Sequence, residues 1–230
     1  MINFTNAKNI ILTAAVSGLF AGLLLTIVQY FFVMPFLFEA ETYEQAATEI
    51  SMPSKVHEME EWQPDDGFER TLYTVLANIS MAFSFSMLLG SAILVSGKHI
   101  NWLSGLLWGT AGYLVFFVAP ALGLPPEVPG TEAAALHDRQ IWWLMTVMTT
   151  AIGLALLVFP HNWMLKFTGL LFLISPHLIG APQPEAHNAV APQTVIESFI
   201  HAAIFANLVL WLSIGLCQGV FTKISQPLDH

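Results

Sequence analysis

Long uncharged stretches alternate with short charged segments along the chain. Six stretches contain no Asp, Glu, Lys or Arg: 9–38, 71–97, 99–126, 140–165, 167–184 and 198–222. Five of them clearly exceed the roughly 20 apolar residues that an α-helix needs to cross a hydrocarbon core about 30 Å thick. Because every backbone amide inside a membrane has to be bonded within its own segment, we expect these stretches to be helical. The pattern predicts membrane-spanning helices near 10–36, 72–96, 101–121, 139–159, 162–179 and 196–220.

The fifth stretch is the weakest of the six. Three prolines, Pro176, Pro182 and Pro184, shorten its apolar run, and a helix that starts at residue 162 includes Lys166. A lysine close to a helix end extends its side chain to the headgroups, so a short crossing is tolerable. The alternative is a re-entrant or interfacial segment, which would move the C-terminus to the other side of the membrane.

Composition agrees with a single polytopic membrane domain over residues 1–230. The chain is 55% hydrophobic and only 10% charged, whereas about a quarter of the residues of a soluble globular protein are charged. Its net charge of −9 argues against nucleic-acid binding, which needs a basic surface. The lone Cys217 excludes an internal disulfide and any multi-cysteine metal cluster. We therefore expect an all-α integral membrane protein, a bundle of six transmembrane helices.

The lysines predict how the bundle is oriented. With six crossings, one side of the membrane holds a single acid, Asp229, and four lysines: Lys8, Lys98, Lys166 and Lys223. The other side holds three basic residues and all the remaining acids, ten of which lie in an outer loop over 39–69. Short loops rich in Lys and Arg stay in the cytoplasm. We therefore expect both termini to be cytoplasmic and the acidic loops to face outward.

The helix ends on the expected outer side follow a loose repeat. The first, third and fifth helices end near Pro35, Pro120 and Pro176, and each following helix begins with an acidic residue. This pattern indicates three helical hairpins, each of which crosses outward and returns. Prolines at helix ends and acids at helix starts are also expected from helix termini alone, so a true three-fold duplication is one of two interpretations.

Ionisable side chains near the outer helix ends are the candidate metal ligands. They are His177, Glu197 and His201 near the ends of the last two helices, and His187, His137 and Glu127 in the outer loops. Glu197 and His201 are four residues apart and so project from one helix face. Imidazole suits cobalt, nickel, zinc and copper, and carboxylates are hard oxygen ligands. The set predicts an imidazole–carboxylate cluster at an outward mouth; the alternatives are interfacial hydrogen bonding for the histidines and simple solvation of the loops for the acids.

The remaining polar and small residues of the spans predict helix packing. Five polar candidates are expected to form interhelical hydrogen bonds: Gln29, Tyr30, Asn78, Tyr113 and Asn207. Two GxxxG patterns, Gly18 to Gly22 and Gly105 to Gly109, permit close approach of helix backbones.

Catalytic and energy-coupling motifs are not found in the sequence. There is no P-loop, HExxH or GxSxG motif, so we expect neither an enzyme nor a bound cofactor. Transport would then follow an electrochemical gradient or draw energy from a partner. The inside-negative potential favours cation entry by about 2.3 kcal/mol per charge per 100 mV.

Three strings of residues resemble the CbtA family of predicted cobalt transporter subunits. They are PALGLPPE at 120–127, RQIWW at 139–143 and PHLIGAPQP at 176–184. The resemblance implies a bacterial inner-membrane protein that supplies Co²⁺ for cobalamin synthesis. It also implies a partner, the small single-span protein CbtB.

We therefore expect a membrane permease subunit for uptake of a divalent transition-metal cation, with membrane lipid and a CbtB-like subunit as partners and no nucleic acid. Co²⁺ is the cation that the resemblance implies, and Ni²⁺ is an alternative because nothing in the composition selects cobalt. The alternative function is a non-transporting membrane scaffold that binds a partner helix through its glycine faces.

Overall fold

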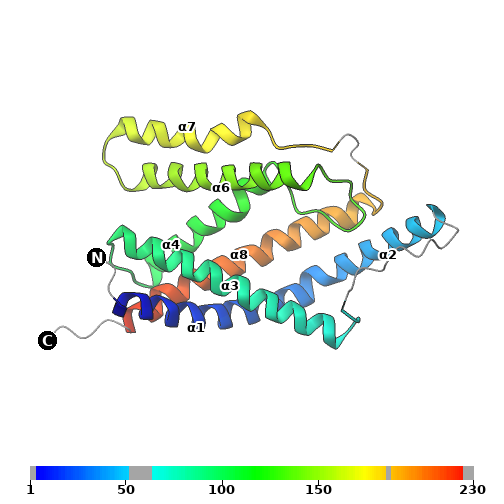
Figure 1. The fold of residues 1–230 in the computed structure, drawn as a ribbon, viewed down its shortest axis with the longest axis horizontal. Coiled ribbons are helices and arrows are strands. Elements are labelled where there is room, and N and C mark those ends of the chain that lie inside the picture. Colours follow the sequence, from blue (N-terminus) through cyan, green and yellow to red (C-terminus); the bar gives the residue numbers. More distant parts are fainter. Residues whose placement is uncertain (1–3, 52–63, 185–187, 225–230) are drawn as a thin grey trace. The chain divides into compact units, whose positions relative to one another are not determined.

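The computed structural model describes residues 4–51, 64–184 and 188–224, and this part of the chain is helical almost throughout (Figure 1). Its elements are α1 (Phe4–Val28), η1 (Gln29–Val33), α2 (Met34–Ser51), α3 (Phe68–Ser96), α4 (Trp102–Tyr113), η2 (Leu114–Val118), α5 (Ala119–Ala121), α6 (Leu136–Val158), α7 (Trp163–Ile179) and α8 (Gln193–Ile224). Within these residues the one β-type contact is an isolated antiparallel bridge between Thr131 and Ala189. The predicted all-α class is confirmed.

Among the described residues, five helical segments are long and apolar enough to cross a membrane. They are Ala7–Glu49, Phe68–Ser96, Trp102–Ala121, Leu136–Val158 and Gln193–Phe221. The sixth, α7, is apolar but has only 17 residues, which makes it about 26 Å long at 1.5 Å per residue. The chain is therefore a multi-pass membrane protein, and the crossing by α7 stays a prediction.

The first helix runs further than the charge pattern predicts. We expected a helix to residue 36 and an acidic loop over 39–69, but the chain is helical through α2 to Ser51. Residues 52–63 of that loop lie outside the described residues. Glutamate ends an apolar stretch without ending a helix, because its intrinsic helix propensity is high. The 43 residues of Ala7–Glu49 span about 65 Å, roughly twice the thickness of a hydrocarbon core.

A π-helical turn precedes a proline in two of the helices. The turns η1 and η2 each end two residues before a proline, in the similar strings FFVMP at 31–35 and FFVAP at 116–120. Proline lacks the N–H of a helical turn and clashes with the carbonyl four residues earlier, and the wider turn accommodates both defects. Both helices also carry Ser-Gly-Leu-x-x-Gly, at 17–22 and 104–109. These shared features support a duplication of the first and third helices; α7 lacks the π-turn.

The chain divides into two compact units, which we describe in turn. Unit 1 consists of Met1–Pro35, Thr48–Thr110 and Ala202–His230, and unit 2 of Phe36–Ala47 and Ala111–His201. Unit 1 therefore contains α1, η1, α3, most of α4 and the greater part of α8. Unit 2 contains part of α2, then η2 to α7, and the first residues of α8.

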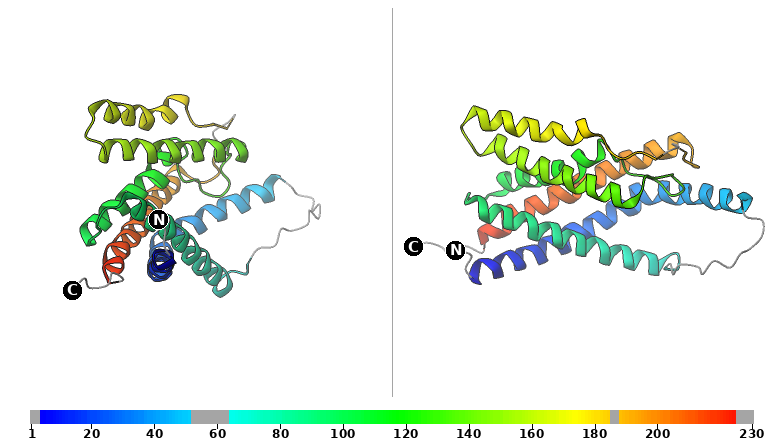
Figure 2. Two further views of the ribbon diagram at one scale, coloured as in Figure 1. Left: turned by 60° about the vertical axis from the view of Figure 1, so that its left-hand side comes forward. Right: turned by 45° about the horizontal axis from the view of Figure 1, so that its top comes forward.

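In unit 1, α1 lies antiparallel against α3 (Figure 2). A Cβ atom placed on Gly18 would lie 2.7 Å from the Cα of Phe83, and one on Gly22 would lie 2.6 Å from the Cα of Ile79. The first GxxxG pattern therefore allows the close helix packing that was predicted, because only glycine lets these two backbones come into contact. Buried residues of α1, α3 and α8 form the core of the unit: Ala21, Leu25, Val28, Ala82, Leu89, Ile93, Ala206, Leu210 and Ile214.

The second GxxxG pattern packs against another of the same spacing. Gly105 and Gly109 of α4 contact Gly215 and Gly219 of α8. A Cβ atom added to any of these glycines would collide with backbone atoms of the facing helix. The prediction of close packing is confirmed here too, although sequence analysis did not single out the pair in α8. Both glycine faces are covered by helices of the chain itself.

One end of unit 1 gathers the start of α1, the α3–α4 connection and the last turns of α8. A cavity of about 270 Å³ at this end is lined by residues of all three segments, among them Asn9, Lys98 and Gln218. Lys8 precedes Asn9, so Lys8 and Lys98 lie at the same end of the unit, as their predicted common side requires.

In unit 2, α6 and α7 run antiparallel, joined by the short connection 159–162 (Figures 1 and 2). The two helices touch at Gly153 and Gly169, where a Cβ on either would lie 2.8 Å from the carbonyl oxygen of the other. The opposite end carries the segments 122–135 and 180–192, and we call it the loop end of unit 2. There Ala40 of α2 packs with Val128, Ala191 and Val195.

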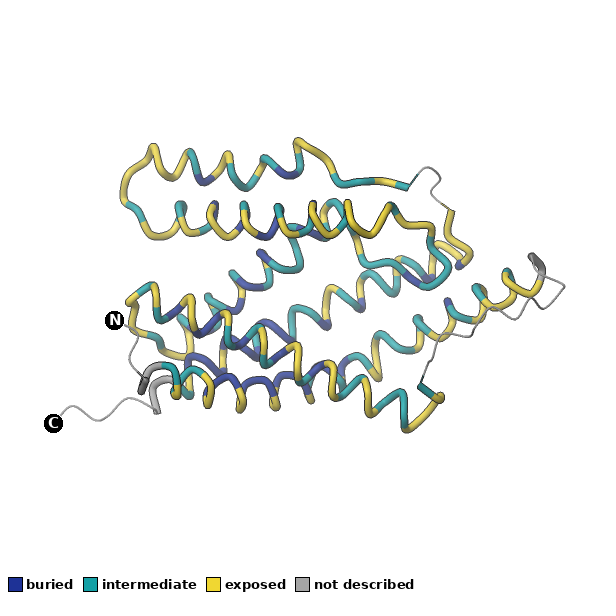
Figure 3. The backbone as a smooth tube through the Cα atoms, viewed as in Figure 1, coloured by how far each residue is buried: buried dark blue, intermediate teal, exposed yellow. Residues whose placement is uncertain are grey.

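The tight glycine contacts pair α1 with α3, α4 with α8 and α6 with α7. Of these pairs, only α1 with α3 is one of the three expected hairpins. The expected hairpins do not predict the α4–α8 and α6–α7 contacts. These contacts form where small residues face one another, because helix backbones approach most closely there. In both units the faces turned away from these contacts are exposed, as Figure 3 shows for α3, α6 and α7, which suits helices surrounded by lipid.

Candidate functional site

The three strings PALGLPPE, RQIWW and PHLIGAPQP converge at the loop end of unit 2. The indole N–H of Trp142 donates a 3.3 Å hydrogen bond to the carbonyl oxygen of Pro176. Gly123 lies against the Trp142 ring, and a Cβ atom there would also lie 2.9 Å from the methyl carbon of Ala181. Each string therefore contacts the other two, and together they build one end of the unit.

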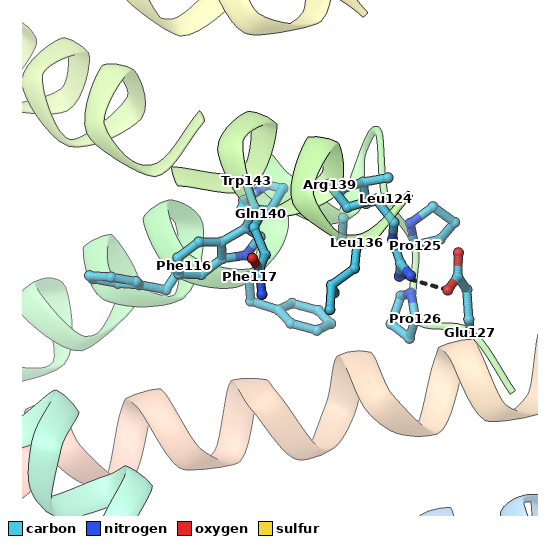
Figure 4. A pocket seen from close by; sticks show the side chains of 12 residues that line it. Phe116, Phe117, Leu124, Pro125, Pro126, Glu127, Leu136, Arg139, Gln140 and Trp143 are labelled. Carbon is cyan, nitrogen blue, oxygen red and sulfur yellow. Dashed lines mark hydrogen bonds and ion pairs between the residues drawn. The ribbon is translucent and has the colours of Figure 1, made fainter. Parts of the chain in front are cut away.

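A cavity of about 480 Å³ lies between the first two strings, with Phe116 and Phe117 of η2 and Leu136 of α6 completing its wall (Figure 4). Arg139 projects toward Glu127 at its edge, and its Nη2 lies 2.7 Å from the Glu127 Oε2 (Figure 4). The two side chains are 28% and 29% exposed. Partial burial makes this charge-assisted pair stronger than a surface ion pair. A metal ion at Glu127 would have to compete with the guanidinium.

His177 is the least exposed of the candidate histidines in the described residues. It is half-buried in the last turn of α7, and its ring stands edge-on to Trp142 with 6.2 Å between the ring centroids. Helix α7 ends at Gly180, whose φ of +84° suits glycine and whose N–H donates to the Pro176 carbonyl at 3.1 Å. The Trp142–Pro176 contact thus fixes the turn that carries His177.

The other candidate ligands are more exposed. Glu197 and His201 are both exposed in the first turns of α8, and Glu197 Oε1 accepts a 3.0 Å hydrogen bond from the Gln193 side chain. His137 is exposed at the second residue of α6. His187 lies outside the described residues. The five predicted ligands among the described residues all belong to unit 2.

The segments that carry several of these residues are tied together. The backbone N–H of Glu132 donates to the Asn188 carbonyl at 3.0 Å, next to the Thr131–Ala189 bridge. Gly130, with a φ of +74°, lies against Glu44 of α2 and Val190. At the loop end, therefore, segment 122–135 is supported both by residues 188–190 and by helix α2.

Over residues 4–51, 64–184 and 188–224, no three His, Cys, Asp or Glu side chains gather closely enough to hold a metal ion. Carboxylate and imidazole groups thus share the loop end without forming a coordination shell from described residues alone. A cluster that includes His187 stays a prediction.

The polar residues of the spans behave differently from one another. Asn78 Nδ2 donates to Gln29 Oε1 at 2.6 Å and to Thr26 Oγ1 at 3.0 Å, so the predicted interhelical bonding is confirmed for Asn78 and Gln29. Asn207 donates to Ala203 within its own helix.

Sequence analysis missed a second interhelical bond. Gln218 Nε2 donates to the Ser86 carbonyl oxygen and to its Oγ, at 2.8 and 2.9 Å. Its signal would have been the eight-residue spacing of Asn78 and Ser86, which places both on one face of α3 with the small Ala82 between them. The Arg139–Glu127 pair was missed as well, although its opposite charges lie in two of the three strings.

The fold and the motif-built loop end define an all-helical, multi-pass membrane protein. The chain belongs to the CbtA family, described as a probable cobalt transporter subunit, whose model matches residues 7–223. The resemblance noted in the sequence is thereby confirmed. Comparison with curated proteins and with solved structures gives no match.

Proposed function

We propose that this protein is the membrane permease subunit of a Co²⁺ uptake system in a bacterial inner membrane, and that it supplies cobalt for cobalamin synthesis. The observation that carries the proposal is the family match over residues 7–223. It is supported by the five helices of spanning length and the shorter apolar one that the described part of the chain contains. The description as a subunit supports a partner, for which a small single-span CbtB-like protein is the candidate.

Both termini lie in the cytoplasm under this proposal, and the loop end of unit 2 faces outward. The support is the common location of Lys8 and Lys98 at one end of unit 1, because short lysine-bearing segments stay in the cytoplasm. With six crossings the α6–α7 connection and Lys166 fall on that side as well.

The outward end collects the cation. Helix α2 adds Glu39, Glu41 and Glu44 to the acids of this end, and a negative surface raises the local concentration of cations. His177, His201 and Glu197, with His187, replace part of the hydration shell of Co²⁺ or of Ni²⁺; His137 and Glu127 are secondary contacts. The membrane potential then favours entry of a divalent ion by about 4.6 kcal/mol per 100 mV.

The alternative function, a membrane scaffold, depends on glycine faces that are free to bind a partner helix. Gly22 packs on Ile79, and Gly109 packs on Trp211 and Gly215. These glycine faces are filled by the chain's own helices and offer no room for a partner helix.

Uptake of radiolabelled cobalt in cells tests the proposal. A strain lacking the gene is complemented with the wild type, His177→Ala, His201→Ala or His161→Ala. His161 is the matched control, because it is an exposed histidine in the α6–α7 connection. We expect His177→Ala and His201→Ala to lower accumulation by roughly tenfold, the usual cost of weakening a metal contact, and His161→Ala to resemble the wild type. Equal accumulation in all strains, including the deletion, would contradict uptake.

A further inference from the structure

The cavity beside Arg139 in unit 2 lies where two membrane-spanning segments end. One span, Trp102–Ala121, ends at Ala121, and the next, Leu136–Val158, begins at Leu136. Both of these terminal residues line the cavity of about 480 Å³, a volume within the range of small-molecule sites. Because the end of an apolar span marks the boundary of the hydrocarbon core, the cavity lies at the level of the lipid headgroups.

The lining of this cavity combines an ion pair near the start of α6 with aromatic rings further along the helix (Figure 4). Four lining residues of α6 are spaced three or four apart and so share one helix face: Leu136, Arg139, Gln140 and Trp143. Trp143 lies about 10 Å along the helix from Leu136, and its ring centroid is 6.3 Å from that of Phe116. The cavity is therefore amphipathic, with its charges at the membrane boundary and its aromatic wall within the apolar span.

The ion pair leaves part of its hydrogen-bonding capacity unused. A guanidinium carries five N–H donors, and the contact between Arg139 and Glu127 joins Nη2 to Oε2. The Arg139 Nε is buried and has no hydrogen-bond partner among the described residues, although buried donors in native proteins are nearly always satisfied. The Glu127 carboxylate can accept a further bond at Oε1. The pair can therefore bind a ligand that brings an acceptor to Arg139 and a donor to Glu127.

The charges of the site select a zwitterion. Arg139 lies in the first turn of α6, whose N-cap residue Ala135 makes no side-chain hydrogen bond. The positive end of a helix and an arginine both favour a phosphate group. Glu127, however, lies 2.7 Å from the guanidinium and would repel a ligand with only negative charge. A ligand that carries a phosphate and an ammonium group satisfies both members of the pair.

We propose that this cavity binds the headgroup of a zwitterionic aminophospholipid, phosphatidylethanolamine. The phosphodiester accepts hydrogen bonds from the Arg139 guanidinium, and the primary ammonium donates to the Glu127 carboxylate. The upper parts of the acyl chains lie against Phe116, Phe117 and Trp143, which is why the ligand is a lipid and not a soluble phosphoester. The glycerol headgroup of phosphatidylglycerol brings no positive charge to Glu127. The amine competes with a metal cation for this carboxylate, in agreement with its secondary place among the proposed metal contacts.

Competition between two lipids for the purified full-length chain tests the site without reference to transport. The chain, freed of cellular lipid in detergent, is mixed with equal amounts of phosphatidylethanolamine and phosphatidylglycerol that have the same acyl chains. Native mass spectrometry then identifies the first lipid bound. We expect the wild type to prefer phosphatidylethanolamine by about tenfold, because Glu127 attracts the ammonium and repels net negative charge. Glu127→Gln leaves Arg139 as the only charge of the pair, so we expect it to reverse the preference.

Arg139→Gln should lower retention of both lipids by about tenfold, since the charge-assisted bonds to the phosphate are lost. Arg70→Gln is the matched control, because Arg70 pairs with Asp66 near the start of α3 at 3.1 Å and does not line the cavity. It should retain lipid as the wild type does.

A wild type that binds the two lipids equally would overturn the site. So would a preference that survives Glu127→Gln, a variant that keeps the arginine and therefore reports even if Arg139→Gln fails to fold. Glycerophosphoethanolamine has the same headgroup without acyl chains, and we expect it to displace the bound lipid only in large excess. Displacement at equal concentration would show that the cavity takes a soluble phosphoester and would overturn the lipid assignment.

Discussion

The two units place their polar groups in different parts of the membrane. Unit 1 holds neutral amides and hydroxyls inside the bundle, where Gln218 and Asn78 bond across helices. Unit 2 concentrates ionisable groups at its loop end, while Thr146 and Thr149 of its spanning helix α6 donate within that helix. A charged group has a high free energy inside lipid and a much lower one at the membrane surface. Unit 1 therefore uses its polar groups to hold helices together inside the bundle, whereas unit 2 keeps its ionisable groups at one end.

The largest expected effect comes from the α4–α8 contact in unit 1. Gly105→Leu forces a side chain into the backbone of Gly215 and Gly219, so the helices have to separate. We expect a loss of about 3 kcal/mol or more in stability, seen as loss of folded protein in detergent. Thr110→Leu, an exposed change on the same helix, is the control, and equal yields of the two variants would show that the contact is dispensable.

The ion pair of unit 2 gives the next largest effect. Arg139→Gln leaves the Glu127 carboxylate partly buried without its counter-charge, and we expect a loss of about 1–2 kcal/mol, between the values for surface and buried pairs. Adding Glu127→Gln removes the stranded charge. Thermal unfolding in detergent should therefore show the double variant to be more stable than the sum of the two single losses; strict additivity would mean that the pair contributes nothing.

The interhelical amide of unit 1 should contribute less than the ion pair. A double-mutant cycle with Gln218→Leu and Ser86→Ala measures the 2.9 Å bond between the two side chains, because the 2.8 Å bond to the Ser86 carbonyl oxygen survives Ser86→Ala. Hydrogen bonds between helices inside membrane proteins average about 0.6 kcal/mol and reach about 1.7 kcal/mol. We expect reversible unfolding to give a coupling energy in this range. A value near zero would show that the interhelical bond does not stabilise unit 1, so that unit 1 would not differ from unit 2 in this respect.

The smallest effect is expected for a threonine of unit 2. Thr149 donates to the Met145 carbonyl in its own helix, and that carbonyl keeps its helical partner without it. Thr149→Val should change the free energy of unfolding by less than about 0.5 kcal/mol. A loss as large as that of Gln218→Leu would show that α6 also depends on its polar side chains.

The helices were largely predictable from the charge pattern, and their pairing was not. Uncharged runs locate apolar spans because lipid excludes charge, but they cannot show that α2 continues the first helix to Ser51, since glutamates are accepted in a helix outside lipid. The glycine spacing at 105–109 predicted a close contact without naming its partner in α8. That partner lies more than one hundred residues away, and only the fold brings the two together.

The placement of the candidate ligands near helix ends and loops was predictable, their contacts were not, and their role as a metal site stays a prediction. The predicted ligands are concentrated in unit 2, mostly at its loop end, because helix ends and loops are where ionisable groups stay hydrated. The Arg139–Glu127 pair and the Trp142–Pro176 bond depend on how the segments fold back on one another. Helical spacing shows which residues share a face; it does not show that Ser86 meets Gln218.

The proposed uptake mechanism requires α7 to cross the membrane, with the loop end of unit 2 outside and the α6–α7 connection inside. His161→Cys and Gln183→Cys, each in the Cys217→Ser background, place one exposed thiol beyond each end of this helix. An impermeant thiol reagent applied to intact cells should label Gln183→Cys and should reach His161→Cys only after the membrane is opened. Labelling of both thiols from the same side would contradict the six-crossing arrangement and the uptake mechanism built on it.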